Sequence, residues 1–547
     1  NGRYALTYVV ETAGAHQWKP RREGSWSISV GGDFGNSAAN ATFTTTHANE
    51  LVLFELDLPG GRVRATPQGI PVRFVFDLAS AGGDGLSWVT AYSNLRTAIQ
   101  NAPTNAQVWV ANGTYRPTGA GGSRSLSFDL RDTIQVLGGF PVNAKGTFQR
   151  DTSQFISILD GDLNDNDTGG LTDPSRNDNS YHVVKSFENG SSAVLDGFLI
   201  TGGNANGGGN NNRGAGLFVQ GSTSSSVPRV QHCTFYRNRA LEFGGAIGTL
   251  NSAPSVQNCG FHDNRSGVDG GAIHNDFGAG SYVNCAFSGN HAVIDGGGMA
   301  FLNSSQHPTV TNCTFSSNSA GSGTGGGVVI KSGSTVTVQN CLFWDNIDDT
   351  LSLQNGQIRE LPGGTLNINY CCIEGWTGSL GGAGNNGLDP RFADADGPDN
   401  IIGTLDDRLW VALDSPAIDS GNSNADIDMG IPGPNPLPTE ATDGFPRQTD
   451  IASVPDTGVG TTPIVDRGAY ESQPILFVRS GVPLATADGR TWASGYPFLR
   501  NAILEADALA GSIKEIWVAE GTYGPHGNIV GGSPSDSFLL VSGRGLY

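Results

Sequence analysis

The sequence has little lysine, little methionine and no long run of apolar residues. Its 547 residues include five lysines and two methionines, and 31 basic against 51 acidic side chains give a net charge of −20. This balance argues against nucleic acid as a partner, because phosphate contacts need clustered basic side chains. No stretch approaches the roughly 18 consecutive apolar residues of a membrane-spanning helix, so the sequence predicts no membrane span.

Charge of either sign is scarce, whereas glycine is abundant. Charged residues make up 15% of the chain, and glycine supplies 80 residues without a three-residue period. The missing period excludes collagen. Because a disordered chain is normally rich in charge, this composition predicts folded β structure with many tight turns.

Common catalytic and metal-binding signatures are also missing. The sequence has no C-x2-C pair, no C-x-x-C-H, no G-x-S-x-G and no phosphate-binding loop. The signatures Asn-Thr-Asp, Gly-His-Gly and Arg-Ile-Lys of polygalacturonase-like enzymes are absent too. Four histidines lack metal-ligand spacing and are expected at exposed turns. Four aspartates are expected near turns, without a matching basic column. These eight residues are His232, His262, His274, His291, Asp263, Asp269, Asp276 and Asp295.

A repeat dominates the middle of the chain. The pattern Cys-x-Phe-x-x-Asn occurs five times, and a glycine pair follows each of the first four copies. Cys371-Cys372-Ile373 looks like a closing copy, and Asp196-Gly-Phe198 like a looser early one. The five copies begin at Cys233, Cys259, Cys285, Cys313 and Cys341.

The repeat predicts the coils of a right-handed parallel β-helix. Cys and Phe, two residues apart, point to the same face of a strand, which a single strand cannot bury. Stacking such strands about 4.8 Å apart turns that face into columns of Cys and Phe. The Asn after each Phe is expected in a left-handed turn with its amide bonded to the Asn of the next coil. The glycine pair marks a second corner that needs positive φ, so each coil is expected to hold two strands.

The cysteines are expected to be reduced thiols that pack in the core. Their number, seven, cannot form a complete set of disulfides. Their spacing lacks the paired geometry of zinc sites, and cysteine is a small, readily buried apolar residue.

A segment before the repeat occurs again near the C-terminus. Residues 84–115 hold an Asp-Gly-x-x-Trp motif, a predicted amphipathic helix at residues 95–99 and a strand, and residues 488–523 repeat this order. A helix over the first coil would shield the open end of the core, as solenoids require. We expect a tandem array that belongs to a longer protein with further caps downstream, and an elongated particle or a larger assembly.

These observations predict an all-β protein with a helical N-terminal cap on its β-helix. Residues 1–70 are expected to form a β-sandwich-like domain or the end of a preceding module. Residues 71–388 are expected to form the capped β-helix, and residues 389–474 an irregular connector over its end. Residues 475–547 are expected to start a second β-helix.

The motifs resemble those of right-handed parallel β-helix repeat proteins of environmental bacteria, including sets with a choice-of-anchor region. The resemblance rests on the cap, on the Asn-Cys-x-Phe coils and on later motifs that include Ser415-Pro-Ala-Ile-Asp419 and Val465-Asp-Arg-Gly-Ala-Tyr470. The coils are also similar to those of chlamydial polymorphic outer-membrane proteins, which are surface adhesins. The resemblance implies a secreted or cell-surface location, and no particular ligand or reaction.

Two acidic loops are candidate calcium sites. Each places oxygen-bearing side chains at alternate positions among flexible residues, as Ca²⁺ loops do. Neither is an EF-hand, because Leu171 and Leu405 stand where the bidentate Glu would be. Turn formation by Asp and Asn is the alternative explanation. The candidate ligands are Asp160, Asp162, Asn164 and Asp167 in one loop, and Asp394, Asp396 and Asp399 in the other.

The sequence favours a non-enzymatic structural or adhesive protein, with Ca²⁺ as a structural ion. Other surface proteins or a surface polysaccharide are the expected partners. The alternative is a polysaccharide-binding or polysaccharide-cleaving β-helix, which would need two carboxylates about 5–10 Å apart on adjacent strands.

Overall fold

The structure is a computed structural model with two compact units, Asn1–Gly280 and Ser281–Tyr547, which we describe separately. It describes residues 3–20, 26–29, 41–57, 62–222, 226–350, 352–427, 437–451, 454–473, 475–484, 487, 489, 494–508, 513, 515–519, 521–523 and 545–546.

The first unit begins with two small antiparallel sheets. Strand β5 (Glu50–Asp57) lies between β1 (Arg3–Val10) and β6 (Arg62–Val75). Strand β2 (Gly14–Pro20) lies between β3 (Trp26–Ser29) and β4 (Ala41–Thr45). A shared buried cluster of Val10, Phe43, Val52 and Phe54 joins the two sheets, as in a small sandwich.

Strand β6 links this domain to the β-helix. Its first part pairs antiparallel with β5, and its last residues, 72–75, pair parallel with β7 (Gln107–Ala111). The expected boundary at residue 70 therefore lies inside a continuous strand. The predicted cap helix is α1 (Leu95–Asn101), which buries Leu95, Ala98 and Ile99.

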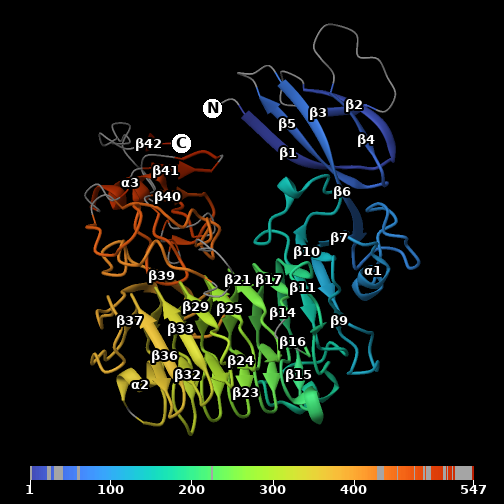
Figure 1. Cartoon of the computed structure of the whole chain (residues 1–547). Coiled ribbons are helices and arrows are strands. Elements are labelled where there is room, and N and C mark those ends of the chain that lie inside the picture. Colours follow the sequence, from blue (N-terminus) through green and yellow to red (C-terminus); the bar gives the residue numbers. More distant parts are fainter. Residues whose placement is uncertain are drawn as a thin grey trace. The chain divides into compact units, whose positions relative to one another are not determined.

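Each coil of the first unit has three main strands, and most coils add a short fourth, rather than the two strands expected (Figure 1). The first sheet continues from β7 through β10 (Gln135–Phe140), β13 (Val194–Asp196), β17 (Arg229–Gln231) and β21 (Ser255–Gln257). The second holds β8 (Gly113–Tyr115), β11 (Ser157–Asp160), β14 (Phe198–Thr201), β18 (Thr234–Tyr236) and β22 (Gly260–His262). The third holds β9 (Phe128–Asp129), β12 (Val184–Phe187), β16 (Leu217–Gln220), β20 (Ile247–Leu250) and β24 (Ile273–Asp276). The short strands are β15 (Asn204–Ala205), β19 (Arg239–Ala240) and β23 (Arg265–Ser266).

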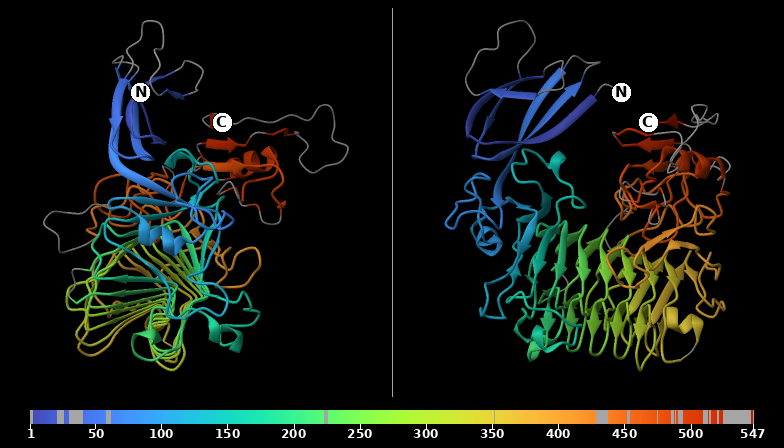
Figure 2. Two further views of the ribbon diagram at one scale, coloured as in Figure 1. Left: turned by 90° about the vertical axis from the view of Figure 1, so that its right-hand side faces the viewer. Right: turned by 180° about the vertical axis from the view of Figure 1, so that it is seen from behind.

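The second unit repeats this coil (Figure 2). Its first sheet holds β25 (Ser281–Val283), β29 (Thr309–Thr311), β33 (Thr335–Gln339) and β36 (Thr365–Asn369). Its second holds β26 (Ala286–Ser288), β30 (Thr314–Ser316), β34 (Leu342–Trp344) and β37 (Cys372–Ile373). Its third holds β28 (Met299–Leu302), β32 (Val328–Ile330) and β35 (Ile358–Glu360), and its short strands are β27 (His291–Ala292) and β31 (Ser319–Ala320). Helix α2 (Leu353–Gln357) precedes β35.

The predicted aromatic column is confirmed within each unit. In the second unit Phe287, Phe315 and Phe343 are fully buried, and their rings stack at centroid distances of 4.4 and 4.9 Å. In the first unit Phe235 stacks on Phe261 at 5.1 Å. All seven cysteines are buried and form no disulfide, as expected of packing thiols.

The asparagine ladder is confirmed, but its backbone conformation was predicted wrongly. Asn318 donates its amide to Asn346 Oδ1 at 2.8 Å and accepts that of Asn290 at 2.9 Å. The residue before each ladder Asn, such as Ser317 (φ 56°), takes the left-handed conformation instead. A second set of positive-φ asparagines, such as Asn312, precedes the cysteines. The ladder Asn points into the coil to hydrogen-bond, so its neighbour must make the turn.

The connector runs along the flank of the coils in the second unit instead of covering only their end. Asn284 Nδ2 donates to the Glu440 carbonyl at 2.8 Å, and Asn340 Oδ1 accepts the Asn422 N–H at 2.7 Å. These positive-φ asparagines lie at the coil corners, where their amides can reach an outside chain. The connector contains one antiparallel pair, β38 (Phe392–Asp394) and β39 (Arg408–Val411).

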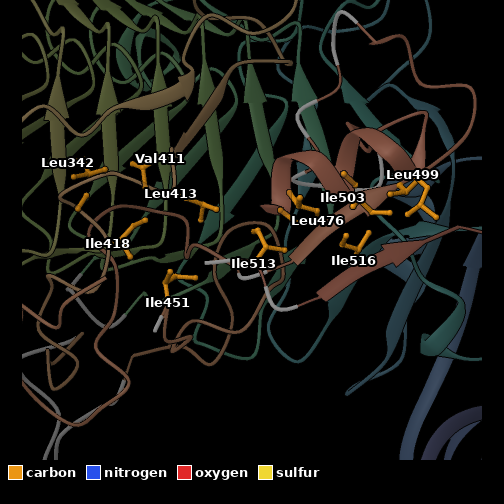
Figure 3. Close-up of a cluster of buried hydrophobic side chains, with 14 of the residues drawn as sticks. Leu342, Val411, Leu413, Ile418, Ile451, Leu476, Leu499, Ile503, Ile513 and Ile516 are labelled. Carbon is orange, nitrogen blue, oxygen red and sulfur yellow. The ribbon is translucent and has the colours of Figure 1, made fainter. Parts of the chain in front are cut away.

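The residues after the connector form strands and a helix like those of the first cap. Strand β40 (Ile475–Val478) pairs parallel with β41 (Glu515–Val518), which pairs with β42 (Gly545–Leu546), and α3 (Leu499–Ala508) lies between β40 and β41 in sequence. Asp488 and Trp492 of the predicted motif lie outside the described residues. Buried side chains of the connector, the coils and this segment form one cluster (Figure 3).

Candidate functional site

The first acidic loop follows strand β11. Asp160 ends that strand, and its carboxylate lies 3.0 Å from Nη2 of Arg116, which also pairs with Asp165. The Asp162 N–H donates to the other oxygen of Asp160 at 3.0 Å. Burial raises the pKa of Asp160 to about 6, and the N–H and Arg116 oppose this shift.

The other three candidates of this loop also have polar partners. Asp162 accepts the backbone N–H groups of Asn164, Asn166 and Asp167 at 2.9–3.2 Å. Asn164 donates its amide to Asp178. These contacts are typical of Asp and Asn in turns.

Asp167 differs from its neighbours because one of its oxygens is unused. Its Oδ2 lies 2.7 Å from Nη1 of Arg176 and accepts the Asn179 amide at 2.9 Å. Among the described residues, its Oδ1 is buried without a hydrogen-bond partner, as are Oδ1 of Asp178 and Oδ1 of Asn179. Burial raises the pKa of Asp167, against the effect of Arg176. Unused buried oxygens at this place are compatible with a bound cation.

The second acidic loop lies between β38 and β39. Asp394 ends β38, 3.8 Å from Nη1 of Arg408, and Asp396 is half-buried. Asp399 is exposed and accepts the Ile401 N–H at 2.8 Å. Within the described residues, neither acidic loop brings three carboxylates within 4.8 Å of one another.

Two histidines of the coils are buried, contrary to the expectation of exposed turns. His274 is 1% exposed and His262 is 8% exposed. Burial lowers the pKa of His262 to about 4, so its ring is neutral near pH 7. Both lie within strands, and the ring of His274 packs against that of Phe243 at a centroid distance of 4.6 Å.

Three of the four aspartates of the coils have basic partners, although no matching basic column was expected. Asp276 lies 3.6 Å from Nη1 of Arg213, and Asp295 lies 2.7 Å from Nζ of Lys331. Asp263 lies 3.3 Å from Nε of Arg237. The partners come from other coils, which is why no spacing along one coil could predict them.

A cavity in the second unit lies where the connector meets the coils. Its volume is about 30 Å³, and Trp410, Tyr470 and Arg467 are among its lining residues. That volume holds one or two water molecules, far less than a sugar ring needs. The cavity therefore does not qualify as a substrate site.

Sequence reasoning missed one acidic group, in the connector. Asp419, Asp450 and Asp456 each place a carboxylate oxygen within 4.8 Å of the others. Asp419 was noted only as part of a family motif, and its separation of 31 positions from Asp450 follows no period that could predict the contact.

Comparison with known proteins supports the class of fold and goes no further. Residues 186–321 and 269–382 match the family model of the right handed β-helix region. No curated protein matches the chain. With the long parallel sheets, this match shows an all-β, right-handed parallel β-helix repeat protein. Among the described residues, no helix has the length and apolar character needed to cross a membrane.

Proposed function

We propose that the chain is an extracellular or cell-surface structural or adhesive protein built from tandem β-helix modules. The observation that carries this proposal is the second cap, which repeats individual hydrogen bonds of the first. The similarity of the coils to those of chlamydial surface adhesins supports the location and the adhesive role.

The two caps share their backbone hydrogen bonds. In the first, the Phe74 N–H donates to the Gly85 carbonyl at 3.0 Å, and the Tyr92 N–H donates to the Phe74 carbonyl at 2.9 Å. In the second, Phe477 donates to the carbonyl of Gly489 at 2.7 Å, and Tyr496 donates to that of Phe477 at 2.8 Å.

The two caps also share side-chain contacts. Trp109 Nε1 donates to Gln107 Oε1 at 2.9 Å, and Trp517 Nε1 donates to Glu515 Oε2 at 2.7 Å. The tyrosine hydroxyl after each tryptophan strand donates to the carbonyl four residues earlier, at 3.0 Å in both caps. Because both backbone and side-chain hydrogen bonds agree, the two segments are two copies of one cap structure.

A cap is useful only where a stack of coils begins, because it covers the apolar end of the first coil. Two caps in one chain therefore support two stacks in series. A series of rods suits a spacer or a surface fibre, whereas a hydrolase gains little from a repeated scaffold. The expected partners are other surface proteins or a surface polysaccharide, in a larger assembly.

Ca²⁺ at residues 160–167 and 394–400 remains part of the proposal as a structural ion. The unused oxygens beside Asp167 support the first loop. The second loop has no comparable support: Asp399 is exposed, and Asp394 and Asp396 are half-buried.

The test combines location, shape and activity. Antibodies against the chain should label intact source cells or their medium, and small-angle scattering of the native protein should give an elongated particle. Incubation with acidic polysaccharides should leave their chain length unchanged. Depolymerisation by a compact native particle would overturn the structural proposal in favour of the polysaccharide-cleaving alternative.

A further inference from the structure

Three carboxylates from distant parts of the connector meet in the second unit. One side-chain oxygen of each of Asp419, Asp450 and Asp456 lies within 4.8 Å of those of the other two. Asp419 is buried, whereas Asp450 and Asp456 are exposed. Like charges at this distance repel one another unless a proton or a cation lies between them.

Apolar packing and backbone hydrogen bonds hold the three residues together. Ile418 and Ile451 both belong to the buried cluster in Figure 3, and each is the sequence neighbour of one of the aspartates. The N–H groups of Thr457 and Gly458 donate to the Asp419 carbonyl at 2.9 and 3.1 Å, which brings Asp456 to the same place. The apolar packing and the backbone hydrogen bonds thus hold the carboxylates close together in spite of their mutual repulsion.

The Asp419 side chain is enclosed in the protein. It is 0% exposed, and within the described part of the chain neither of its carboxylate oxygens has a hydrogen-bond partner. An unpaired buried carboxylate is costly, so it is normally neutralised by a proton or by a bound metal.

Asp466 does not belong to the group of three, and each of its own oxygens accepts a backbone N–H. Its Oδ1 accepts the Asp419 N–H at 2.8 Å, and its Oδ2 accepts the Ser472 N–H at 2.7 Å. The oxygens available to a ligand are therefore those of Asp419 inside and of Asp450 and Asp456 at the surface.

We propose that Asp419, Asp450 and Asp456 bind one Ca²⁺ ion, which fastens the connector to itself. All three ligands are hard carboxylate oxygens, the type that Ca²⁺ prefers, without the nitrogen or sulfur that zinc and copper sites use. Ca²⁺–oxygen bonds of about 2.4 Å let two ligand oxygens lie at most about 4.8 Å apart, and the three oxygens lie within that limit. The exposed Asp450 and Asp456 leave room for the water ligands that a coordination number of six to eight requires. This site is independent of the two loops that the sequence predicted and of the proposed function.

Calcium titration of the whole chain by calorimetry, with EDTA-treated protein near neutral pH, tests the site. Asp419→Asn and Asp450→Asn should each remove one bound Ca²⁺ per chain, or weaken its binding by at least about tenfold. Glu440→Gln is the matched control, because it removes one exposed negative charge from the same connector outside the group. It should leave both the number of ions and their affinity unchanged.

Melting temperatures distinguish a lost ligand from a damaged fold. Ca²⁺ should raise the Tm of the wild type and of Glu440→Gln, since an ion bound only by the folded state stabilises it. Without Ca²⁺, Asp419→Asn should melt at or above the wild type, because it removes a buried unpaired carboxylate, and added Ca²⁺ should raise its Tm less. Wild-type stoichiometry and affinity in Asp450→Asn, whose exposed side chain the fold does not need, would overturn the proposal. So would a wild type that binds no Ca²⁺.

Discussion

Replacing Phe287 by alanine tests the aromatic column directly, because this ring has no solvent contact and a defined stacking partner. It is fully buried and lies 4.4 Å from Phe315 at an interplanar angle of 5°. A buried Phe→Ala change costs about 3–5 kcal/mol of unfolding free energy, and the lost ring stacking supplies about 0.5–1.5 kcal/mol of that.

The loss should be local, since each coil of a solenoid contacts only its neighbours. Native-state hydrogen exchange is therefore the better assay, and it avoids assuming two-state unfolding of a repeat protein. A loss of about 3 kcal/mol should speed exchange in residues 286–288 and 314–316 by at least about 100-fold. Urea unfolding of the same variant gives the global figure.

Phe187→Ala provides the matched control for this experiment. The ring of Phe187 is 63% exposed at the end of β12, so its loss should cost no more than about 0.5 kcal/mol. Equal losses in the two variants, or unchanged exchange around Phe315, would refute the aromatic column and with it the register of the coils.

Four further predictions address the ladder, the buried histidine, the acidic loops and the connector. Asn318→Ala should lower the free energy of unfolding in urea by about 2–4 kcal/mol, because it leaves ladder amides without partners. A loss below about 0.5 kcal/mol, which is typical of substitutions at exposed sites, would contradict the ladder. The folded pKa of His262, about 4, lies below the unfolded value of about 6.5, so the unfolded chain binds more protons between them. Stability should therefore fall by about 3 kcal/mol as pH drops from about 6.5 to about 4, and His262→Gln should reduce that fall. If residues 160–167 and 394–400 bind Ca²⁺, a chelator should lower the Tm of Asp419→Asn as well, and an unchanged Tm would remove both loops as sites. Arg467→Ala should expose the connector to limited proteolysis while the coils stay protected, and equal protection would show that its hydrogen bond to Cys371 is dispensable.

The coils could be predicted from the sequence because their contacts repeat at a fixed spacing. The 28-residue spacing that places Phe315 over Phe287 also places Asn318 over Asn290, so one sequence period predicts both the aromatic core and the asparagine ladder. The turn conformation was assigned to the wrong residue because composition alone does not separate the Asn inside the coil from its positive-φ neighbour. A pattern of residue types shows where a corner lies, and hydrogen bonding decides which residue makes it.

The connector and its acidic group could not be predicted, because they depend on contacts without a period. Asp419 meets Asp450 only because Ile418 and Ile451 enter the same apolar cluster. The ion pairs of the coils illustrate the same limit, since Arg213 and Asp276 are 63 residues apart and come from different coils. Irregular chain joins residues by packing, which a single sequence does not display.

The buried thiols allow local opening of the wild-type chain to be measured by chemical labelling. All seven cysteines are buried and outside any disulfide, so an alkylating reagent can reach each one only while the surrounding strands are apart. Five successive repeats each carry one of these thiols, so labelling followed by peptide mapping would measure the opening rate of each repeat without any engineered probe. The five residues are Cys233, Cys259, Cys285, Cys313 and Cys341. Because these thiols form no cross-link, a reductant should leave the labelling rates unchanged, and the order in which the cysteines react would reveal from which end the stack unzips.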